Sequence, residues 1–242
     1  MLDIVFRKIF WPYIFLRDRY VEHQLDALSE EDRFRLIYKT GYWKGVGGGS
    51  LSGEGSSLAA TAAIRDSLSG LLARFDIRSM LDVPCGDWYW MSKVELGNIA
   101  YIGGDIVEEL VQENQRLYGK SGREFRKVNL IADDLPKVDL IFVRDCLVHL
   151  EPEQIQLCVR NVIKSGSTYF ATTTFTDVTE NRMPVLKDRW RPLNMMLQPY
   201  YFPAPVELLD DSWPANPADV RKCIGVWRVS DLSSRFPGRT AI

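Results

Sequence analysis

The sequence is short of the features that mark several common protein classes. Among its 242 residues there are only four cysteines and two histidines, and no two cysteines form a Cys-x-x-Cys pair. This spacing fits neither a disulfide framework nor a zinc site, so we expect a cytoplasmic chain with no structural metal. Neither sign of charge dominates, because 30 basic and 32 acidic residues give a formal net charge of -2. A nucleic-acid partner is therefore not expected.

The hydrophobic runs near the N-terminus are too short to cross a membrane. Residues 4–16 are largely apolar, but Arg7 and Lys8 interrupt them, and a spanning helix needs about 20 consecutive apolar residues. A signal peptide also fits poorly, because the charged stretch 17–19 follows without a small-residue cleavage site. Two interpretations of residues 1–20 stay open: an amphipathic element, at the inner face of a membrane or in a dimer interface, or a helix packed on the body of the protein.

A glycine- and serine-rich stretch at residues 41–57 divides the chain. It can form neither a regular helix nor a regular strand, so it marks a boundary. We expect residues 1–57 to form an N-terminal helical segment with a Gly/Ser-rich lid, and residues 58–242 to form the main domain.

Beyond this boundary, short apolar runs typical of strands alternate with helical patterns. Strands are expected at 79–83, 99–105, 125–130, 138–144, 168–174 and 223–229, and helices at 58–75, 106–118 and 153–163. The alternation predicts an α/β fold, in which helices cover both faces of a parallel, doubly wound, Rossmann-like sheet. The proline-rich tail beyond Trp190 is expected to be irregular up to the last strand.

Polar residues follow the first expected strand, where such a sheet binds its ligand. The turn contains Gly86, but it departs from Gly-x-Gly-x-x-Gly by carrying Pro84 and Trp88. This departure argues against a dinucleotide, because a diphosphate needs close glycine backbone and a helix N-terminus. The carboxylates of Asp82 and Asp87 are better matched to the cationic sulfonium and amino groups of S-adenosylmethionine (SAM).

The next two strand ends extend this predicted cofactor site. Asp105, about 20 residues further on, can accept hydrogen bonds from both ribose hydroxyls, although NAD would suit the same acid. Asn129 and Leu130 follow the third strand and can contact the edge and the face of an adenine. Each residue alone could be a turn or capping residue. Their occurrence at three consecutive strand ends favours a cofactor site.

Asp145 and His149 follow the fourth expected strand, near the position of the transferred methyl group. Methyl transfer requires alignment of the reactants and removal of the acceptor's proton, and a sugar hydroxyl ionises far above neutral pH. His149 is the only histidine in the expected catalytic region, and we take it as the candidate general base. Its alternative role is helix packing. Asp145 can orient His149, act as the base itself or help to hold a divalent cation.

Four further residues are candidates for binding the acceptor. Trp190, Arg191 and Asn194 supply an aromatic face, a planar cation and an amide, which are the usual means of holding a polyhydroxylated ring. Tyr42, in the N-terminal segment, joins this set. The alternative for Trp190 is burial against the sheet, as is common for tryptophan.

Five segments together carry a resemblance to a known family. They read Ser-Gly-Glu-Gly-Ser-Ser at 52–57, Leu-Asp-Val-Pro-Cys-Gly-Asp at 81–87, Tyr-Ile-Gly-Gly-Asp-Ile-Val at 101–107, Arg-Asp-Cys-Leu-Val-His-Leu at 144–150 and Trp-Arg-Pro-Leu-Asn at 190–194. Beyond its first 40 residues the chain resembles bacterial class I SAM-dependent methyltransferases, a group often linked to polysaccharide or glycan biosynthesis. Some of these enzymes methylate sugar hydroxyls.

The resemblance implies residue roles and an activity. It implies that the Gly/Ser-rich loop closes over the methionine end of SAM and that Arg144, Asp145 and His149 face the reaction. The whole cofactor-binding set that we expect is Ser56, Asp82, Gly86, Asp87, Trp88, Asp105, Ile106, Asn129, Leu130 and Arg144. The expected activity is methyl transfer from SAM to a hydroxyl of a small-molecule or glycan acceptor. Another small or lipid-linked acceptor, or a non-catalytic nucleotide-binding module, are the alternatives.

Overall fold

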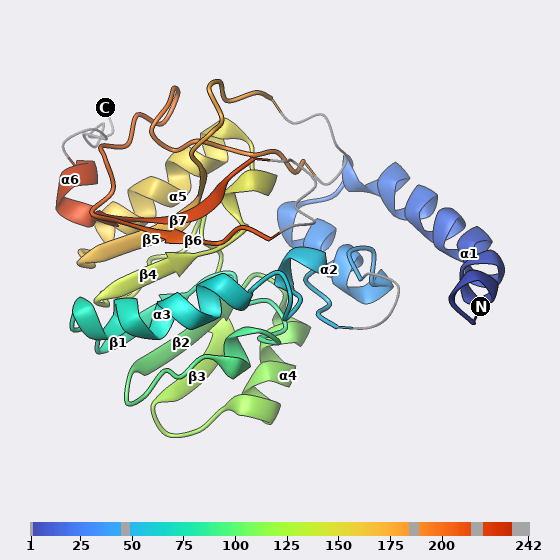
Figure 1. Ribbon diagram of the computed structural model, residues 1–242, viewed down its shortest axis with the longest axis horizontal. Helices are drawn as coiled ribbons and strands as arrows, with labels where there is room; N and C mark the ends of the chain where they lie inside the picture. The colour runs from blue at the N-terminus through green and yellow to red at the C-terminus, as the bar shows by residue number, and fades with distance from the viewer. Residues whose placement is uncertain (1, 45–48, 184–188, 214–219, 234–242) are drawn as a thin grey trace.

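The computed structural model describes the backbone of residues 2–44, 49–183, 189–213 and 220–233, with side chains from residue 13 onward. Within these residues a seven-stranded sheet has the order β3-β2-β1-β4-β5-β7-β6 (Figure 1). Its strands are β1 (Ser79–Asp82), β2 (Ala100–Asp105), β3 (Arg123–Lys127), β4 (Leu140–Val143), β5 (Tyr169–Phe175), β6 (Glu207–Asp210) and β7 (Lys222–Arg228). The expected α/β, Rossmann-like sheet is thereby confirmed.

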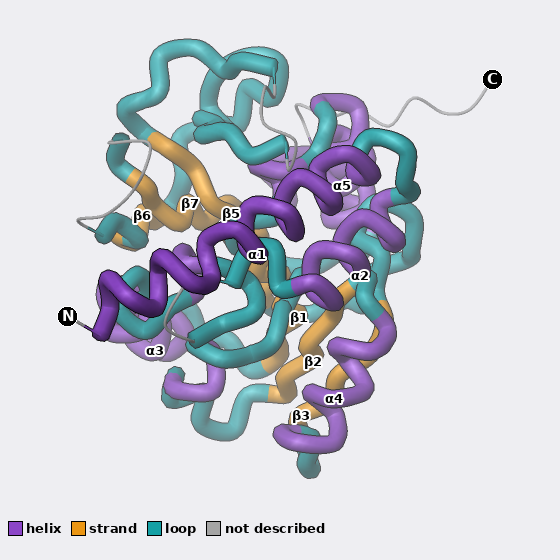
Figure 2. The backbone as a smooth tube through the Cα atoms, turned by 90° about the vertical axis from the view of Figure 1, so that its right-hand side faces the viewer, coloured by secondary structure: helices purple, strands orange, loops and turns teal. Residues whose placement is uncertain are grey.

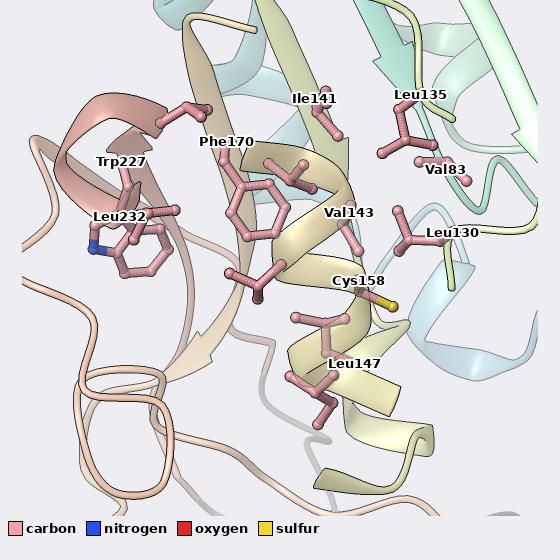
Figure 3. Packing of buried hydrophobic residues seen from close by; sticks show 14 of the residues in the cluster. Val83, Leu130, Leu135, Ile141, Val143, Leu147, Cys158, Phe170, Trp227 and Leu232 are labelled. Atoms are coloured by element: carbon pink, nitrogen blue, oxygen red, sulfur yellow. The ribbon is translucent and has the colours of Figure 1, made fainter. Parts of the chain in front are cut away.

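Helices cover both faces of the sheet, and successive strand residues pack on opposite sides. In β4, Leu140 and Phe142 belong to the cluster that contains α3 (Ala62–Arg74) and part of α4 (Glu108–Tyr118). Ile141 and Val143 belong to the other cluster, with α5 (Pro152–Lys164) and α6 (Val229–Ser233). Figure 3 shows this second cluster, in which Phe170 lies beside α5 and Trp227 lies beside Leu232 of α6. Burial on both faces explains why β4 is an unbroken apolar run.

The prediction that the sheet is parallel is wrong for one strand. β7 is antiparallel to both β5 and β6, and Lys222 at its start pairs with Phe175 at the end of β5. The connection between them, residues 176–221, therefore leaves and re-enters the sheet at the same end. It also contains the edge strand β6, although the tail was expected to be irregular up to the last strand. The sequence did not reveal β6, because this strand is defined by its pairing with β7.

The start of α3 and the end of β3 differ from the predicted boundaries, because local hydrogen bonds turn the chain at both places. The helix expected from residue 58 begins at Ala62, because residues 58–61 form turns in which the Ser57 hydroxyl accepts a hydrogen bond from the Ala60 amide at 3.1 Å. The strand expected at 125–130 ends at Lys127. Asn129 turns the chain there, since its side-chain oxygen accepts a hydrogen bond from the Ile131 amide at 2.9 Å.

Two N-terminal helices precede the sheet, and they lie on the side from which Figure 2 is viewed. Helix α2 (Glu30–Thr40) begins at Ser29, whose hydroxyl accepts a hydrogen bond from the Asp32 amide, and ends at Gly41 with φ of 62°. Ile37 of α2 packs with Val21 and Leu25 from the end of α1 (Leu2–Leu25). The packed-helix interpretation therefore holds for the C-terminal end of α1.

The preceding part of α1 projects from the body of the protein (Figure 1). Tyr13, Phe15, Leu16 and Tyr20 are exposed on it. The side chains of residues 1–12, on which much of the membrane or dimer prediction rests, lie outside the described part of the structure. Within the described chain, no helix combines the length and the apolar character that a membrane span requires.

Helix α5 offers a matched test of how the core stabilises the fold. Ile155 is fully buried against the sheet, whereas Leu157 on the same helix is 42% exposed. Ile155→Ala should lower the free energy of unfolding by about 2–5 kcal/mol, through lost burial and the cavity left behind. Leu157→Ala should change it by about 0.5 kcal/mol or less. Urea unfolding followed by circular dichroism measures both, and equal effects would contradict this packing.

Candidate active site

A cavity of about 560 Å³ opens at the carboxyl ends of β1, β2 and β4. The strand ends contribute Asp82, Gly86, Asp87, Asp105, Ile106, Asn129, Leu130, Arg144, Asp145 and His149. Helix α2 and the loop after it contribute Glu30, Phe34, Tyr38, Trp43 and residues 52–56, which include Ser56. Trp190, Trp213 and Lys222 come from the C-terminal region. Twelve of the predicted site residues therefore meet in one cavity, and Trp88, Tyr42, Arg191 and Asn194 do not line it.

Trp88 lies in the hydrophobic core, which corrects its assignment to the cofactor site. Its side chain is buried, and its indole N–H donates a hydrogen bond to the Tyr101 hydroxyl at 2.7 Å. The rings of Tyr118 and Phe125 pack against it. Its place in the turn motif predicted a ligand contact, but a large apolar ring gains more from burial beside other rings.

Arg191 supports the C-terminal chain instead of lining the acceptor site. Its guanidinium donates hydrogen bonds to the backbone carbonyls of Val148, Leu150, Arg182 and Arg189, at 2.6–3.2 Å. Irregular backbone leaves such carbonyls without the partners of a helix or sheet, and Arg191 satisfies them. The expected acceptor contact is thus replaced by a structural role.

Asn194 and Tyr42 are likewise engaged away from the cavity. The Asn194 amide donates a hydrogen bond to the Val178 carbonyl at 3.0 Å, and its backbone N–H donates to the Asn181 side chain at 2.8 Å. The Tyr42 hydroxyl donates to Glu22 on α1 at 3.0 Å. The residue types that suit a sugar ring also suit loop and helix anchoring, and only the tertiary structure separates these roles.

Two buried acids dominate the end of the cavity formed by β1 and β2. Burial raises the pKa of Asp82 to about 7, although the Tyr101 hydroxyl donates a hydrogen bond to it. Burial also raises the pKa of Asp105 to about 6, against hydrogen bonds from the amides of Gly86 and Val107 at 3.1 and 3.0 Å. Each pKa is raised because the carboxylate lacks a cation sufficient to offset its lost hydration. A cationic ligand would complete this environment.

Asp87 holds the Gly/Ser-rich loop over the cavity. Its carboxylate accepts hydrogen bonds from the Ser50 hydroxyl at 2.8 Å and the Leu51 amide at 2.5 Å. The Ser52 hydroxyl lies so close to Gly86 that a Cβ there would come within 2.4 Å of it, and Gly86 has a φ of 56°. Glycine at this position is therefore required by both its backbone conformation and the approach of the loop.

A cluster of four charges lies at the end of β4, and two of its members were not predicted. Arg144 forms a two-bond ion pair with Asp211, at 2.9 and 3.0 Å, and contacts Asp145 at 3.2 Å. The Lys222 ammonium lies 2.5 Å from Asp145 and 3.0 Å from Asp211. Lys222 and Asp211 carry no local motif and are distant in sequence from β4, so the sequence offered no signal for them.

This cluster corrects two of the roles considered for Asp145. Burial opposes its ionisation, but the cations of Lys222 and Arg144 outweigh burial and lower its pKa to about 2. Asp145 is therefore an ionised carboxylate at neutral pH and a very weak base. Its Oδ2 already faces two cations, and no group of three His, Cys, Asp or Glu side chains gathers among the described residues. This donor set does not fit a divalent cation.

His149 lies across the same cavity on the short helix η3 (Leu147–His149). It is 9% exposed, and its ring packs on Trp43, with 5.0 Å between ring centroids. Trp190, the one member of the predicted acceptor set that lines the cavity, packs edge-on against Phe175 at 6.2 Å. Aromatic rings from three separate segments thus line the cavity that contains the imidazole.

Glu30 is a further cavity residue that sequence reasoning missed. One of its carboxylate oxygens accepts hydrogen bonds from Arg33, Gln154 and Arg189, at 3.1, 3.1 and 3.2 Å. It therefore ties α2 to α5 and to the C-terminal region beside the cavity. No pattern around residue 30 distinguishes it from an ordinary first-turn acid.

No family model and no curated protein sequence matches this sequence. Solved methyltransferase structures do resemble the fold. The Burkholderia thailandensis 1,6-didemethyltoxoflavin-N1-methyltransferase, bound to its substrate and S-adenosylhomocysteine, has a TM-score of 0.51 at 18% identity, covering 69% of this chain and 78% of that one. The Synechocystis magnesium protoporphyrin IX methyltransferase with bound S-adenosylhomocysteine has a TM-score of 0.54 at 14% identity, covering 81% and 93%.

A third similar structure is human N-acetylserotonin methyltransferase in complex with SAM. Its TM-score is 0.53 at 14% identity, and the match covers 90% of this chain and 66% of that one. The three acceptors named for these structures differ widely in chemistry. The chain has the class I methyltransferase fold, and this fold by itself does not select an acceptor.

Arg191 and a neighbouring exposed arginine test the structural role of the C-terminal region. Arg191→Ala should lower the free energy of unfolding by about 2–3 kcal/mol, because several buried carbonyls lose a charged donor. Arg182→Ala in the same region should change it by about 0.5 kcal/mol or less, since its side chain is 84% exposed. Thermal and urea unfolding provide the comparison. Wild-type stability of the Arg191 variant, with loss of acceptor binding alone, would restore the acceptor assignment.

Proposed function

We propose that the chain binds SAM in this cavity and transfers the methyl group to a hydroxyl of a sugar or glycan acceptor. The observation that carries the proposal is the joining of two regions in one enclosed space. Buried acids lie at the strand ends of a class I methyltransferase fold, and His149 with Asp145 lies beside them. The first region suits a cationic cofactor, and the second can handle a hydroxyl proton.

The strand-end residues fit the parts of SAM. Asp105 can accept hydrogen bonds from the ribose hydroxyls, because its two oxygens, which accept from the Gly86 and Val107 amides, offer further acceptor sites. Asn129 and Leu130 lie at the side where an adenine would extend, together with Ile106. Asp82, Arg144 and Ser56 are assigned to the amino-acid end of SAM. Ser56 belongs to the Gly/Ser-rich loop that Asp87 holds. When bound, SAM supplies an electrophilic methyl group on a sulfonium.

The acceptor side supplies a base and aromatic walls. In the proposed reaction the O–H bond of the acceptor breaks and His149 takes the proton. The oxygen forms the new bond to the methyl carbon as the S–CH₃ bond breaks, and S-adenosylhomocysteine leaves. Asp145 is not the base in this proposal, because the cations of Lys222 and Arg144 favour its ionised form and hold its pKa well below the usual range. Trp43 and Trp190 line the cavity, and tryptophan side chains suit contact with the C–H groups of a sugar ring. Another small or lipid-linked acceptor is the second candidate, and a non-catalytic nucleotide-binding module is the third.

Incubation with labelled SAM and a panel of glycans tests the proposed acceptor directly. Mass spectrometry should show the gain of one CH₂ per transfer on a sugar. Methylation of lipid-linked or non-sugar acceptors alone would favour the second candidate. Binding of SAM without turnover on any class of acceptor would favour the third.

Replacement of Asp105 tests the cofactor site. Asp105→Ala should weaken SAM binding by roughly 1.5–3 kcal/mol, because charge-assisted hydrogen bonds to the ribose are lost. Isothermal calorimetry with SAM and with NAD measures the effect and the choice of cofactor. Asp76→Ala, at a 79%-exposed acid paired with Arg78, serves as the control and should leave the affinity unchanged. Binding of NAD in preference to SAM would contradict the cofactor assignment.

The pH dependence of SAM affinity provides an internal check on the same site. Asp105 and Asp82 have raised pKa values of about 6 and about 7. As the pH falls through these values the carboxylates take up protons, so a cationic ligand should bind more weakly in acid. Each protonation should cost up to about tenfold in affinity per pH unit. Asp105→Asn should flatten the lower part of this profile, and an unaltered profile would remove Asp105 from the site.

Replacement of His149 tests the proposed base. His149→Ala should lower kcat by about 10²–10⁴-fold, the usual contribution of general-base catalysis, with SAM affinity nearly unchanged. Wild-type activity should also fall in acid, because a general base must be unprotonated to accept a proton, and the variant should lack this limb. His23→Ala, at an exposed histidine on α1, is the matched control. A His149 variant with most of its kcat and the wild-type acid limb would move the role to another group.

For residues 1–20 we propose a peripheral contact, either with the inner face of a membrane or with a second copy of the chain. The support is the set of exposed aromatic and aliphatic side chains on the projecting part of α1. A cytoplasmic location at the membrane accompanies the first alternative. Vesicle sedimentation and light scattering of the full chain distinguish the two.

A further inference from the structure

Lys222 occupies an unusual position for a lysine. It is the first residue of β7, its side chain is 3% exposed, and it reaches the cavity. Its ammonium contacts Asp145 and Asp211 and lies 5.5 Å from the centre of a Trp213 ring. A buried ammonium is costly without anionic partners. The two carboxylates and the ring therefore account for its burial, and they also make it part of the site.

Asp145 is the member of the charge cluster that reaches the solvent side of the cavity. Its side chain is 26% exposed, whereas those of Lys222 and Arg144 are 3–4% exposed. Oδ2 faces both cations, and Oδ1 accepts only a 3.3 Å hydrogen bond from Thr173 among the described residues. Oδ1 therefore retains acceptor capacity for a donor in the cavity.

The backbone of Asp145 also requires support from its neighbours. Its φ is 53°, in the left-handed region that is unfavourable for most residues other than glycine. Its amide donates a 2.8 Å hydrogen bond to the Thr173 hydroxyl on β5. Side-chain and backbone contacts from β5 and β7 thus hold one carboxylate in one orientation. Arg144 cannot do this alone, because it is also bonded to Asp211 and to the Gly55 carbonyl.

We propose that Lys222 is a positioning residue, which fixes the Asp145 carboxylate so that Oδ1 accepts a hydrogen bond from a second hydroxyl of the acceptor while His149 takes the proton of the reacting hydroxyl. The inference rests on the proposed function of the cavity. The charged or titratable groups around Asp145 are Arg144 from β4, Lys222 from β7, Asp211 after β6 and His149 from η3. Of the two cations, Lys222 is the closer to the Asp145 carboxylate, at 2.5 Å against 3.2 Å for Arg144.

Lys222→Met removes the charge and keeps a side chain of similar length. It should lower kcat/KM for the acceptor by about 10–100-fold, as for the loss of a well-oriented hydrogen bond to a charged group. SAM affinity measured by calorimetry should stay within about twofold. Protonation of Asp145 should then add a second group to the acid limb of kcat/KM and make it steeper, since loss of the cation raises the pKa of Asp145. Lys222→Arg retains the charge and should keep the wild-type limb.

A double-mutant comparison separates positioning through Asp145 from a general structural role. In an Asp145→Asn background, Lys222→Met should cause less than about a twofold further loss of kcat/KM, because its target has already been neutralised. Arg74→Met, which removes the exposed ion pair between α3 and Glu207 of β6, is the control and should leave the pH profile unchanged. Independent, multiplying effects of the Lys222 and Asp145 replacements would overturn the proposal.

A readout without turnover keeps this inference distinct from the proposed function. Carbon NMR of the Asp145 carboxyl should show no titration between pH 8 and 4 in the wild type and a titration within that range in Lys222→Met. Lys222→Gln, which keeps hydrogen-bond donors, replaces Lys222→Met if the latter does not fold. If the Asp145 signal is unchanged in a folded Lys222→Met or Lys222→Gln variant, the proposed role of Lys222 is wrong. If the wild type and Lys222→Met give these NMR results but the wild type methylates no hydroxyl, the proposed function is contradicted instead.

Discussion

The cavity depends on a buried cluster of two cations and two carboxylates where the ends of β4 and β5 meet β7. Arg144 comes from the end of β4, Lys222 begins β7, and Asp211 follows β6. Bringing these groups out of water is costly, and their mutual attraction offsets that cost only because the hydrogen bonds are short and numerous. The cluster can form only when antiparallel β7 lies between β5 and β6. The order of the strands and the chemistry at their ends therefore depend on each other.

The N-terminal segment belongs to the same site, although it is separated from the sheet in the sequence. The carboxylate of Asp87 holds the loop at residues 50–52, and Ser52 in turn bonds to Tyr38 of α2 at 2.8 Å. Glu30 ties the beginning of α2 to α5 and the C-terminal region. The cavity is consequently covered by elements from both ends of the chain. Its enclosure favours electrostatic interactions, because water is reduced around the acids at the strand ends.

The buried carboxylates of the cavity differ in how readily they ionise. Asp82 and Asp105 have raised pKa values because burial dominates, whereas the cations beside Asp145 reverse the effect of burial. One type of side chain thus serves two purposes, set by its partners. Asp82 and Asp105 lack a cation sufficient to offset their burial, whereas Asp145 is held as an anion by two cations. This contrast is what assigns proton removal to His149 in the proposed reaction.

Much of the fold follows from local sequence patterns. Alternating apolar runs and helical segments place six of the strands, including the fully buried β4, and the acids after β1, β2 and β4 line the cavity. The direction of β7, the existence of β6 and the roles of Arg191, Asn194 and Tyr42 do not follow from those patterns. They depend on which backbone carbonyl, carboxylate or strand edge each segment meets after folding.

The sequence by itself therefore determined the type of sheet and the end of it at which polar side chains gather, because strand periodicity and turn residues are local properties. Only the tertiary structure decided that Trp88 is a core residue, that Asp145 is paired with Lys222 and that α2 covers the cavity. Each of these depends on contacts between residues far apart in the chain. The energies of such contacts arise from burial and charge, and neither is defined until the chain has folded.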